Sequence, residues 1–415
     1  MAFHNVRFPQ CATSVSPPCH LRFTPPRSSR SIRSLASVEG KQAQSDPQSQ
    51  LLSSIQGVSG RGQGGLSESQ LQTFNDAVER LEEDVGIENP TASEVLQGRW
   101  KLQFTSKPGT ESPIQRTFTG VDAFRIYQDI VEDAQGVRIR NVVRFPDWLG
   151  ALRVEAEGST DSRKIPGFVP RKGEGLPVFG KSLTTPPDRK DKRIDFWFDR
   201  AAFKFSFLPF KVPYPVPFRL FGDETKGWLD VSYLAPDGDF RLSRGNKGTL
   251  FVLTKEERST KQMLLDAIAE GALEEEVLNL IKEIKGSNPT DQPAKSPKAL
   301  GKWRVIWSKQ GPNANPFQKA FADFRQWQTI EEESVENLAS LLPGLVRLRV
   351  AGSVQPISDT KTEVIVEKFA FEIPGREFPV DVPKDDVGFI KWLYLDDDMR
   401  VTAGNRGTLY VHVRE

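Results

Sequence analysis

Few side chains in this sequence are of the types that carry out nucleophilic, redox or metal chemistry. Its two cysteines, Cys11 and Cys19, and two of its three histidines lie within the first 37 residues, which leaves only His412 beyond them. Thiol catalysis, disulfides and zinc sites require Cys or clustered His. A Ser-His-Asp triad would have to use His412, and no Gly-x-Ser-x-Gly motif accompanies it. We therefore predict no catalytic residues, no metal and no cofactor.

The first 37 residues differ in composition from the rest of the chain. They contain several Arg and Ser residues but no acid, and the first carboxylate is Glu39. They lack the compact apolar run of a secretory signal, and their Arg-rich, acid-free character is typical of organelle import. We predict a chloroplast transit peptide over residues 1–37, with cleavage near Ala36. The alternative is a disordered basic tail.

Charge and hydropathy argue against nucleic acid as a partner and against a membrane-spanning segment. The formal net charge is +1, and no basic surplus or recognition motif indicates nucleic acid. No stretch reaches 18 consecutive apolar residues, so no transmembrane segment is expected.

The strongest pattern in the sequence is an internal repeat. Gly98–Ser106 recurs as Gly301–Lys309, and Phe240–Val252 recurs as Met399–Val411. Landmarks between them keep the same order: Gly158-Ser159 matches Gly352-Ser353, Phe203-x-Phe205 matches Phe369-x-Phe371, and Trp228-Leu229 matches Trp392-Leu393. The second copy is shorter, mainly because it lacks the Pro-, Gly- and Lys-rich stretch at 161–192, which is typical of a long loop. The repeat predicts two domains, 38–254 and 255–415.

Within each copy, apolar and polar residues alternate with period two, which predicts half-buried β-strands. The segments that show this pattern are 137–143, 152–157, 193–198, 202–207, 248–253, 345–350, 362–369 and 407–413. Seven to nine short antiparallel strands per copy favour an up-and-down barrel over a doubly wound sheet. The predicted fold class is mainly β, with two tandem antiparallel β-barrels.

Amphipathic helices precede both predicted barrels. Ser67 and Gln70 form a capping box that opens the first helix. Before the second copy, 260–285 carries an apolar stripe beside an acidic face. Because helices at membrane surfaces favour Lys and Arg, we expect this stripe to pack on a barrel rather than on a membrane. The Pro-containing stretch 287–299 is predicted to be a flexible joint.

The motifs together resemble the plastid lipid-associated proteins, also called fibrillins or plastoglobulins. The resemblance lies in a helix followed by Gly-x-Trp-x-Leu-x-Phe-Thr-Ser from Gly98, and in a domain end marked by Arg-Gly-Asn-x-Gly-x-Leu-Phe-Val-Leu from Arg244. It implies lipocalin-like barrels that bind or coat apolar lipids, such as carotenoids, prenylquinones and neutral lipids. It also implies peripheral association with plastoglobules or thylakoids, and it brings no catalytic residues. In the second copy Ala403 stands in the place of Arg244, so its ligand is expected to be lost or altered.

Trp100 and Trp303 resemble the tryptophan that closes one end of lipocalin barrels. In such barrels an Arg from a late strand covers the indole by a cation–π contact. Arg244 or Arg241 is the candidate in the first copy, and Arg400 in the second. We expect these residues to close the barrels rather than to contact a ligand.

Aromatic residues on the predicted strands are the candidates for lining a ligand cavity, since alternate residues of a strand face a barrel interior. They are Phe196, Phe198, Phe203, Phe205 and Phe207 in the first copy, and Phe369 and Phe371 in the second. The alternative is that these rings fill an ordinary core.

The segment 207–221 combines four prolines with aromatic residues and two basic ones. Proline excludes a central strand, so this apolar segment is predicted to be a loop that meets a lipid surface. Its candidate contacts are Phe210, Tyr214, Phe218 and Phe221. An extended edge segment packed over the barrel is the alternative.

Three functions are compatible with these patterns. The first is a non-catalytic protein that binds or coats apolar plastid lipids. The second is an enzyme acting on prenyllipids or xanthophylls, which would need acids inside a barrel, whereas the predicted inward positions are apolar. The third is a structural scaffold with solid barrels, which would have no cavity able to admit a prenyl tail.

Overall fold

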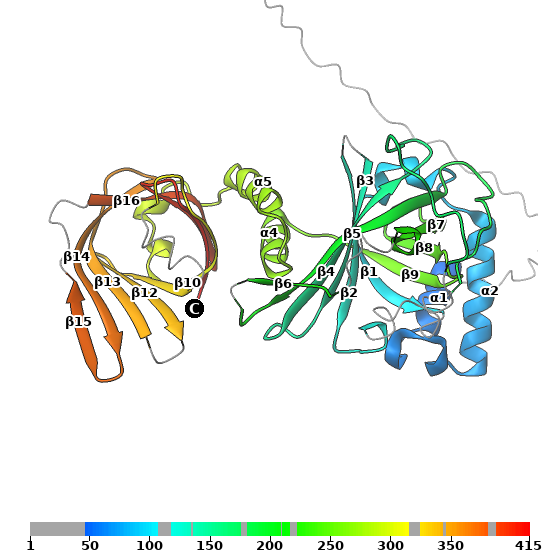
Figure 1. Ribbon diagram of the computed structural model, residues 1–415, viewed down its shortest axis with the longest axis horizontal. Helices are drawn as coiled ribbons and strands as arrows, with labels where there is room; N and C mark the ends of the chain where they lie inside the picture. The colour runs from blue at the N-terminus through cyan, green and yellow to red at the C-terminus, as the bar shows by residue number, and fades with distance from the viewer. Residues whose placement is uncertain are drawn as a thin grey trace, which may run out of the picture. The chain divides into compact units, whose positions relative to one another are not determined.

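The computed structural model describes residues 46–106, 118–133, 136–175, 181–208, 210–215, 222–314, 324–342, 346–380 and 387–415. The predicted transit peptide, 1–37, lies outside the described residues. The described part is mainly β and contains two antiparallel sheets that follow one another along the chain, each curved into a ring (Figure 1). The predicted fold class is confirmed.

The first sheet closes on itself. Its strand order is β4-β3-β2-β1-β9-β8-β7-β5-β6, and an additional pairing of β4 with β5 completes the ring. The strands are β1 (Gly98–Thr105), β2 (Arg125–Asp133), β3 (Gly136–Arg144), β4 (Gly150–Ser159), β5 (Arg193–Phe205), β6 (Lys211–Pro213), β7 (Lys226–Leu234), β8 (Phe240–Gly245) and β9 (Leu250–Glu256). The prediction of separate strands at 193–198 and 202–207 is wrong, because β5 runs through both. A register shift at Glu155/Ala156 of β4 keeps the long β5 paired.

The second sheet repeats this topology in the order β13-β12-β11-β10-β18-β17-β16-β14-β15, with β13 also paired to β14. Its strands are β10 (Gly301–Lys309), β11 (Arg325–Ile330), β12 (Ser334–Leu342), β13 (Val346–Pro356), β14 (Lys361–Ile373), β15 (Arg376–Val380), β16 (Val387–Leu395), β17 (Met399–Gly404) and β18 (Leu409–Arg414).

Equivalent residues of the two copies occupy equivalent registers. Trp100 lies opposite Gln128, and Trp303 lies opposite Gln328. The first strand of each ring is also bulged at the same place, between Leu102 and Phe104 in one copy and between Val305 and Trp307 in the other. The internal repeat is therefore a structural repeat.

Two helices cover the outer face of the first ring. They are α1 (Pro47–Ser54) and α2 (Glu68–Asp84), and the capping box predicted for α2 is present, with Ser67 and Gln70 as its partners. Apolar residues of α2 such as Phe74 and Leu81 pack on Phe240 and Leu242 of β8. The 3₁₀ helices of the described residues are η1 (Ser59–Arg61), η2 (Gln63–Gly65), η3 (Pro90–Ala92), η4 (Glu94–Leu96), η7 (Gly222–Thr225), η8 (Pro293–Lys295) and η9 (Pro297–Ala299).

The helical segment before the second ring consists of two helices, α4 (Thr260–Ala269) and α5 (Glu274–Lys285). Gly271, at φ 67°, lies in the turn between them. Their apolar residues, including Leu264 and Ile281, pack with Met399 and Val401 of β17. The expectation that this stripe packs on a barrel is confirmed.

The prediction of a flexible joint at 287–299 is wrong. The backbone amide of Ala294 donates to Asp359 O (3.0 Å), and Leu395 N donates to Asn288 Oδ1 (2.9 Å). Ala294 and Ala299 are buried in the core of the second ring. Proline fixes φ at a value that suits the first turn of a helix, so here the prolines build two short 3₁₀ turns instead of a linker.

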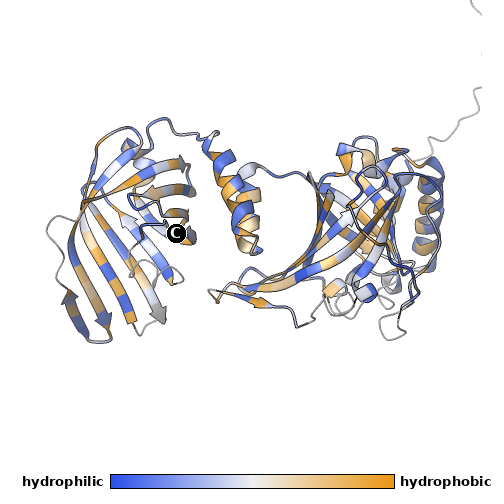
Figure 2. Ribbon diagram, turned by 45° about the horizontal axis from the view of Figure 1, so that its top comes forward, coloured by the Kyte–Doolittle hydropathy of each residue, from blue (hydrophilic) through white to orange (hydrophobic). Residues whose placement is uncertain are grey.

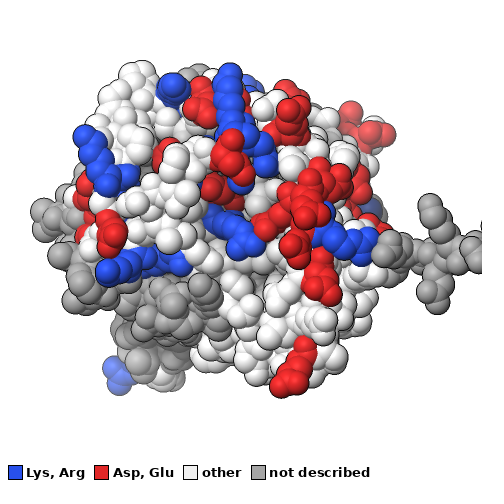
Figure 3. Space-filling view, turned by 90° about the vertical axis from the view of Figure 1, so that its right-hand side faces the viewer, with Lys and Arg blue, Asp and Glu red and all other residues white. Residues whose placement is uncertain are grey.

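Hydropathy alternates along the strands of both sheets (Figure 2). No helix of the described residues has the length and apolar character needed to cross a membrane. On the face seen in Figure 3, acidic and basic side chains are interspersed over uncharged surface.

Candidate functional site

One end of each ring is closed by a tryptophan beneath an arginine. The Arg241 guanidinium carbon lies 4.6 Å from the Trp100 ring centre, and that of Arg400 lies 4.7 Å from the Trp303 ring centre. All four side chains are fully buried. Each indole N–H donates to a backbone carbonyl just before its strand, Leu96 O at 2.8 Å and Ala299 O at 3.0 Å. This is the geometry of a barrel floor.

Arg244 lies elsewhere than expected. It forms a two-pronged ion pair with Glu82 of α2, at 2.7 Å for both contacts, on the outside of the ring. Successive residues of a strand face opposite sides of a sheet, so Arg241 and Ser243 face inward whereas Arg244 faces outward. Of the two arginines considered for Trp100, the structure selects Arg241. The replacement of this arginine by Ala403 in the second copy therefore affects a contact with a helix rather than the barrel interior.

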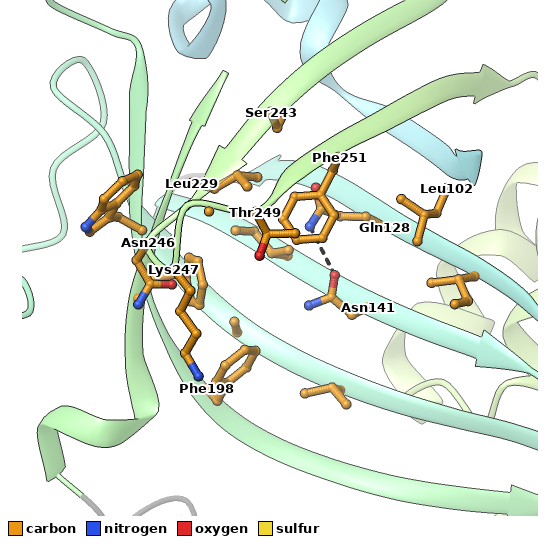
Figure 4. Close-up of a pocket in the computed structure, with 18 of the residues that line it drawn as sticks. Leu102, Gln128, Asn141, Phe198, Leu229, Ser243, Asn246, Lys247, Thr249 and Phe251 are labelled. Atoms are coloured by element: carbon orange, nitrogen blue, oxygen red, sulfur yellow. Dashed lines mark hydrogen bonds between the residues drawn. The ribbon is translucent and has the colours of Figure 1, made fainter. Parts of the chain in front are cut away.

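Above this floor, the first ring encloses a cavity of about 330 Å³ (Figure 4). Its wall is mostly apolar, and alternate residues of the strands supply it. The apolar lining includes Leu102, Ile126, Ile139, Val143, Leu152, Val154, Ala156, Phe196, Phe198, Leu229, Phe251 and Leu253. At the mouth, Arg171 pairs with Glu224 (3.2 Å).

Polar side chains cross the wall as a belt just above the floor. Arg241 Nη2 donates to Gln128 Oε1 (2.7 Å), and Gln128 Nε2 donates to Asn141 Oδ1 (3.0 Å). Ser243 lies in the same lining (Figure 4). We name Gln128, Asn141 and Ser243 the polar belt.

Sequence reasoning missed the polar belt, although the repeat carried a signal for it. In the second ring Arg400 donates to Gln328, and Gln328 Nε2 donates to Asn337 Oδ1 (2.7 Å). Each ring therefore has a Gln and an Asn at equivalent, inward-facing positions of two neighbouring strands. Comparing the copies for repeated inward polar residues would have found both pairs.

The aromatic candidates divide into two groups. Phe196 and Phe198 line the cavity, with ring centres 5.2 Å apart. Phe203, Phe205 and Phe207 form a stacked row that continues away from it, at 5.5 and 5.4 Å. In the second copy Phe369 and Phe371 are half-buried and meet edge to face at 5.9 Å.

The structure describes the proline-containing segment 207–221 only in part, because Phe218 and Phe221 lie outside the described residues. Phe210 is 59% exposed, whereas Tyr214 packs on Phe203 and lines the cavity. Sequence reasoning missed Trp148, which is 72% exposed. Its neighbours Asp147 O and Leu149 O accept hydrogen bonds from Ser206, so Trp148 lies beside the exposed Phe207. We name Trp148, Phe207 and Phe210 the aromatic rim.

His412, the single histidine outside the predicted transit peptide, is buried in β18 opposite Arg400. Burial, together with the nearby Arg400 charge, holds the pKa of His412 well below its ordinary value. Among the described residues, no three His, Cys, Asp or Glu side chains are grouped so that they could hold a metal ion.

The sequence is similar to known proteins along most of its length. The PAP_fibrillin family model matches residues 45–165, 187–254 and 261–413, which leaves out part of the long loop of the first copy. The chain belongs to the PAP_fibrillin family. A probable plastid-lipid-associated protein 12, chloroplastic, of Arabidopsis thaliana is 37% identical over 89% of this chain and 82% of its own length.

Other relatives match a smaller part of the chain. A chromoplast-specific carotenoid-associated protein of Cucumis sativus is 28% identical over 40% of this chain and 56% of its own length. Plastid lipid-associated protein 1, chloroplastic, of Brassica campestris is 29% identical over 40% of this chain and 55% of its own length. The relatives are thus plastid proteins named for their association with lipid or carotenoid.

Proposed function

We propose that this protein is a non-catalytic, lipid-binding protein of plastids whose first barrel holds an apolar chain. The observation that carries the proposal is the apolar cavity inside the first ring, with Phe196 and Phe198 in its wall. Ligand pockets typically measure about 300–1,000 Å³, are lined mainly by apolar side chains and contain few polar groups. A cavity of this kind favours carriage of a lipid over a scaffold with a solid first barrel.

A peripheral position on a plastoglobule or thylakoid surface extends the proposal. The aromatic rim exposes three large rings from neighbouring turns of the first barrel. Exposed apolar clusters on a protein surface are typical of interaction sites, and an indole ring suits the boundary between water and lipid. The names of the relatives place those proteins in plastids, which supports the same location for this chain.

The domain organisation that goes with this function is a transit peptide at 1–37 followed by lipid-binding domains at 38–254 and 255–415. The second domain shares the closed ring, the floor tryptophan and the Gln–Asn pair of the first. We propose carotenoids, prenylquinones and neutral lipids as the classes of lipid that the protein binds or coats.

Lipid mass spectrometry on protein purified from plastid membranes tests the proposal. Ala156→Leu adds three carbons inside the cavity, whereas Glu157→Leu adds apolar surface at the exposed neighbouring position of the same strand. We expect wild type and Glu157→Leu to carry the same lipid, and Ala156→Leu to carry at least fivefold less. Equal amounts of lipid on both variants would contradict binding in this cavity. Turnover of a prenylquinone or xanthophyll by the pure protein would contradict the non-catalytic assignment.

A further inference from the structure

The hydrogen bonds of the polar belt have only one possible direction. An arginine side chain donates and never accepts, so the Gln128 oxygen must face Arg241 Nη2. The Gln128 amide nitrogen then donates to the Asn141 oxygen, which turns Asn141 Nδ2 toward the cavity (Figure 4). The chain that starts at a cation therefore ends in an amide donor.

This donor end of the chain is unused. Among the described residues, Asn141 Nδ2 donates no hydrogen bond, and the buried Ser243 hydroxyl has no hydrogen-bond partner. A buried polar group that makes no hydrogen bond costs about 1–3 kcal/mol. Ser243 Oγ is such a group, and together with the unused Asn141 Nδ2 in the wall of the same cavity it indicates a ligand that supplies an acceptor atom.

The cation at the other end of the chain is also uncompensated. Arg241 is fully buried, its Nε and Nη1 have no hydrogen-bond partner, and no carboxylate of the described residues pairs with it. Burial lowers the pKa of Arg241 to about 9, which leaves the guanidinium charged at pH 7. A buried charge that no opposite charge pairs is unfavourable, so a negative charge bound in the cavity would offset part of that cost.

The rest of the cavity fits one hydrocarbon chain. From the polar belt toward the mouth, the wall consists of Val143, Phe198 and Phe251, with Tyr214 at the open end. A volume of about 330 Å³ is at the small end of the range for ligand pockets. At the mouth, Arg171 and Lys226 already pair with Glu224 and Asp223. The unused donors are thus deep in the barrel, and a ligand that satisfies them enters head first.

Building on the proposed function, we propose that the first cavity binds a single-chain lipid carboxylate head first, with Asn141 Nδ2 and Ser243 Oγ donating to the carboxylate. Single-chain lipid acids and alcohols both offer an acceptor oxygen at the end of one long chain. The buried Arg241 charge selects the carboxylate over a neutral head group. The acyl chain then lies among the phenylalanine rings of the wall.

Competition binding on the full chain tests this inference. Lauric acid and 1-dodecanol, which share a twelve-carbon chain, are titrated at pH 8 against the neutral fluorophore N-phenyl-1-naphthylamine. We expect the acid to bind about tenfold more tightly than the alcohol, the value of one hydrogen bond to a charged acceptor. Equal affinities would overturn the assignment of a carboxylate.

Asn141→Asp is the sharpest variant, because it keeps the oxygen that accepts from Gln128 and replaces the donor with a negative group. We expect it to weaken the acid at least tenfold and the alcohol less than about threefold. Asn337→Asp, at the equivalent place in the second ring, is the matched control and should leave the acid affinity unchanged. Loss of acid binding in Asn337→Asp but not in Asn141→Asp would overturn the assignment to the first cavity.

Ser243→Ala gives a second test that does not depend on the folding of Asn141→Asp. It removes a hydroxyl that makes no hydrogen bond in the free protein, so the thermal midpoint should not fall. Its acid-to-alcohol affinity ratio should drop about threefold, and an unchanged ratio would count against Ser243 as a donor. If neither lipid displaces the fluorophore from wild type, the proposed function itself fails. If both bind alike in every variant, only the head-group inference fails.

Discussion

At the scale of single residues, the two rings are closed by the same pair of side chains. Trp100 and Trp303 were predictable because the Gly-x-Trp motif marks the first strand of each copy. Arg400 was predictable by its place in the repeat, but the choice between Arg241 and Arg244 required the strand's orientation. The buried cation–π contacts of Arg241 with Trp100 and of Arg400 with Trp303 predict that the two indole rings stabilise the fold.

Trp100→Phe and Trp303→Phe each keep an aromatic ring but lose the indole N–H bond and weaken the cation–π contact. We expect each to lower the free energy of unfolding by about 1–2 kcal/mol, measured by urea denaturation. Trp148→Phe is the control, since this indole is exposed and should change stability by less than about 0.5 kcal/mol. A loss as large for Trp148→Phe as for Trp100→Phe would argue against the floor assignment.

The buried His412 should make the stability of the second ring depend on pH. Its pKa is lowered in the fold, so between its ordinary value of about 6.5 and the lowered value the unfolded chain binds more protons than the folded one. Stability should therefore be complete above about pH 6.5 and should decrease as the pH falls below it.

The replacement His412→Leu tests this linkage, because Leu253 stands opposite Arg241 where His412 stands opposite Arg400. We expect denaturation midpoints measured from pH 7.5 to 5 to fall less steeply for His412→Leu than for wild type. Parallel pH profiles would show that His412 does not supply this dependence.

At the scale of elements, the aromatic residues along β5 and just after it separate into a cavity wall and a surface. The alternation along 193–207 predicted inward-facing rings, and Phe196 and Phe198 do line the cavity. Phe207 lies past the end of the strand and is 54% exposed, which a period-two pattern does not show. Trp148 could not be predicted either, because its position beside Phe207 depends on the pairing of β4 with β5.

The aromatic rim should drive binding to a lipid surface. The double variant Phe207→Ser with Phe210→Ser removes two exposed rings, so we expect partitioning onto galactolipid vesicles to fall at least tenfold. Co-sedimentation measures this partitioning. Phe378→Ser is the control, because it removes an exposed aromatic side chain from the second sheet. We expect it to change partitioning by less than twofold. Equal losses in both proteins would mean that contact with lipid is not localised at the rim.

At the scale of the whole molecule, the acidic side of α4 is buried against arginines of the first ring. Arg99 of β1 forms two-pronged contacts with Asp129 and with Glu270, at 2.7–2.8 Å, and also meets Asp266. Burial alone would raise the pKa of Asp129, but the hydrogen bonds and charge of Arg99 outweigh it and lower that pKa. The pKa of Glu270 is raised, because burial outweighs its contacts with Arg99. The sequence showed that 260–285 has an acidic face beside its apolar stripe, but periodicity does not reveal a second surface that supplies partners for the acids.

Removing one member of this buried cluster should be costly. Arg99→Met leaves Asp129 and Glu270 buried without their main partner, so we expect a loss of about 3–5 kcal/mol in the free energy of unfolding. Lys302→Met, at the equivalent repeat position, removes an exposed ion pair with Glu415 and should cost less than about 1 kcal/mol. Similar losses for the two variants in urea denaturation would contradict a special role for the Arg99 cluster.

The central claim is that a lipid chain lies inside the first barrel, and cross-linking tests it most directly. A fatty acid with a photoactivatable diazirine near the end of its chain is bound to the full-length protein and irradiated. Its adducts are then mapped by peptide mass spectrometry. We predict adducts on wall residues toward the mouth, namely Phe198, Tyr214 and Phe251, and their loss in Ala156→Leu but not in Glu157→Leu. Adducts confined to Trp148, Phe207 and Phe210 would contradict internal binding and leave only surface coating.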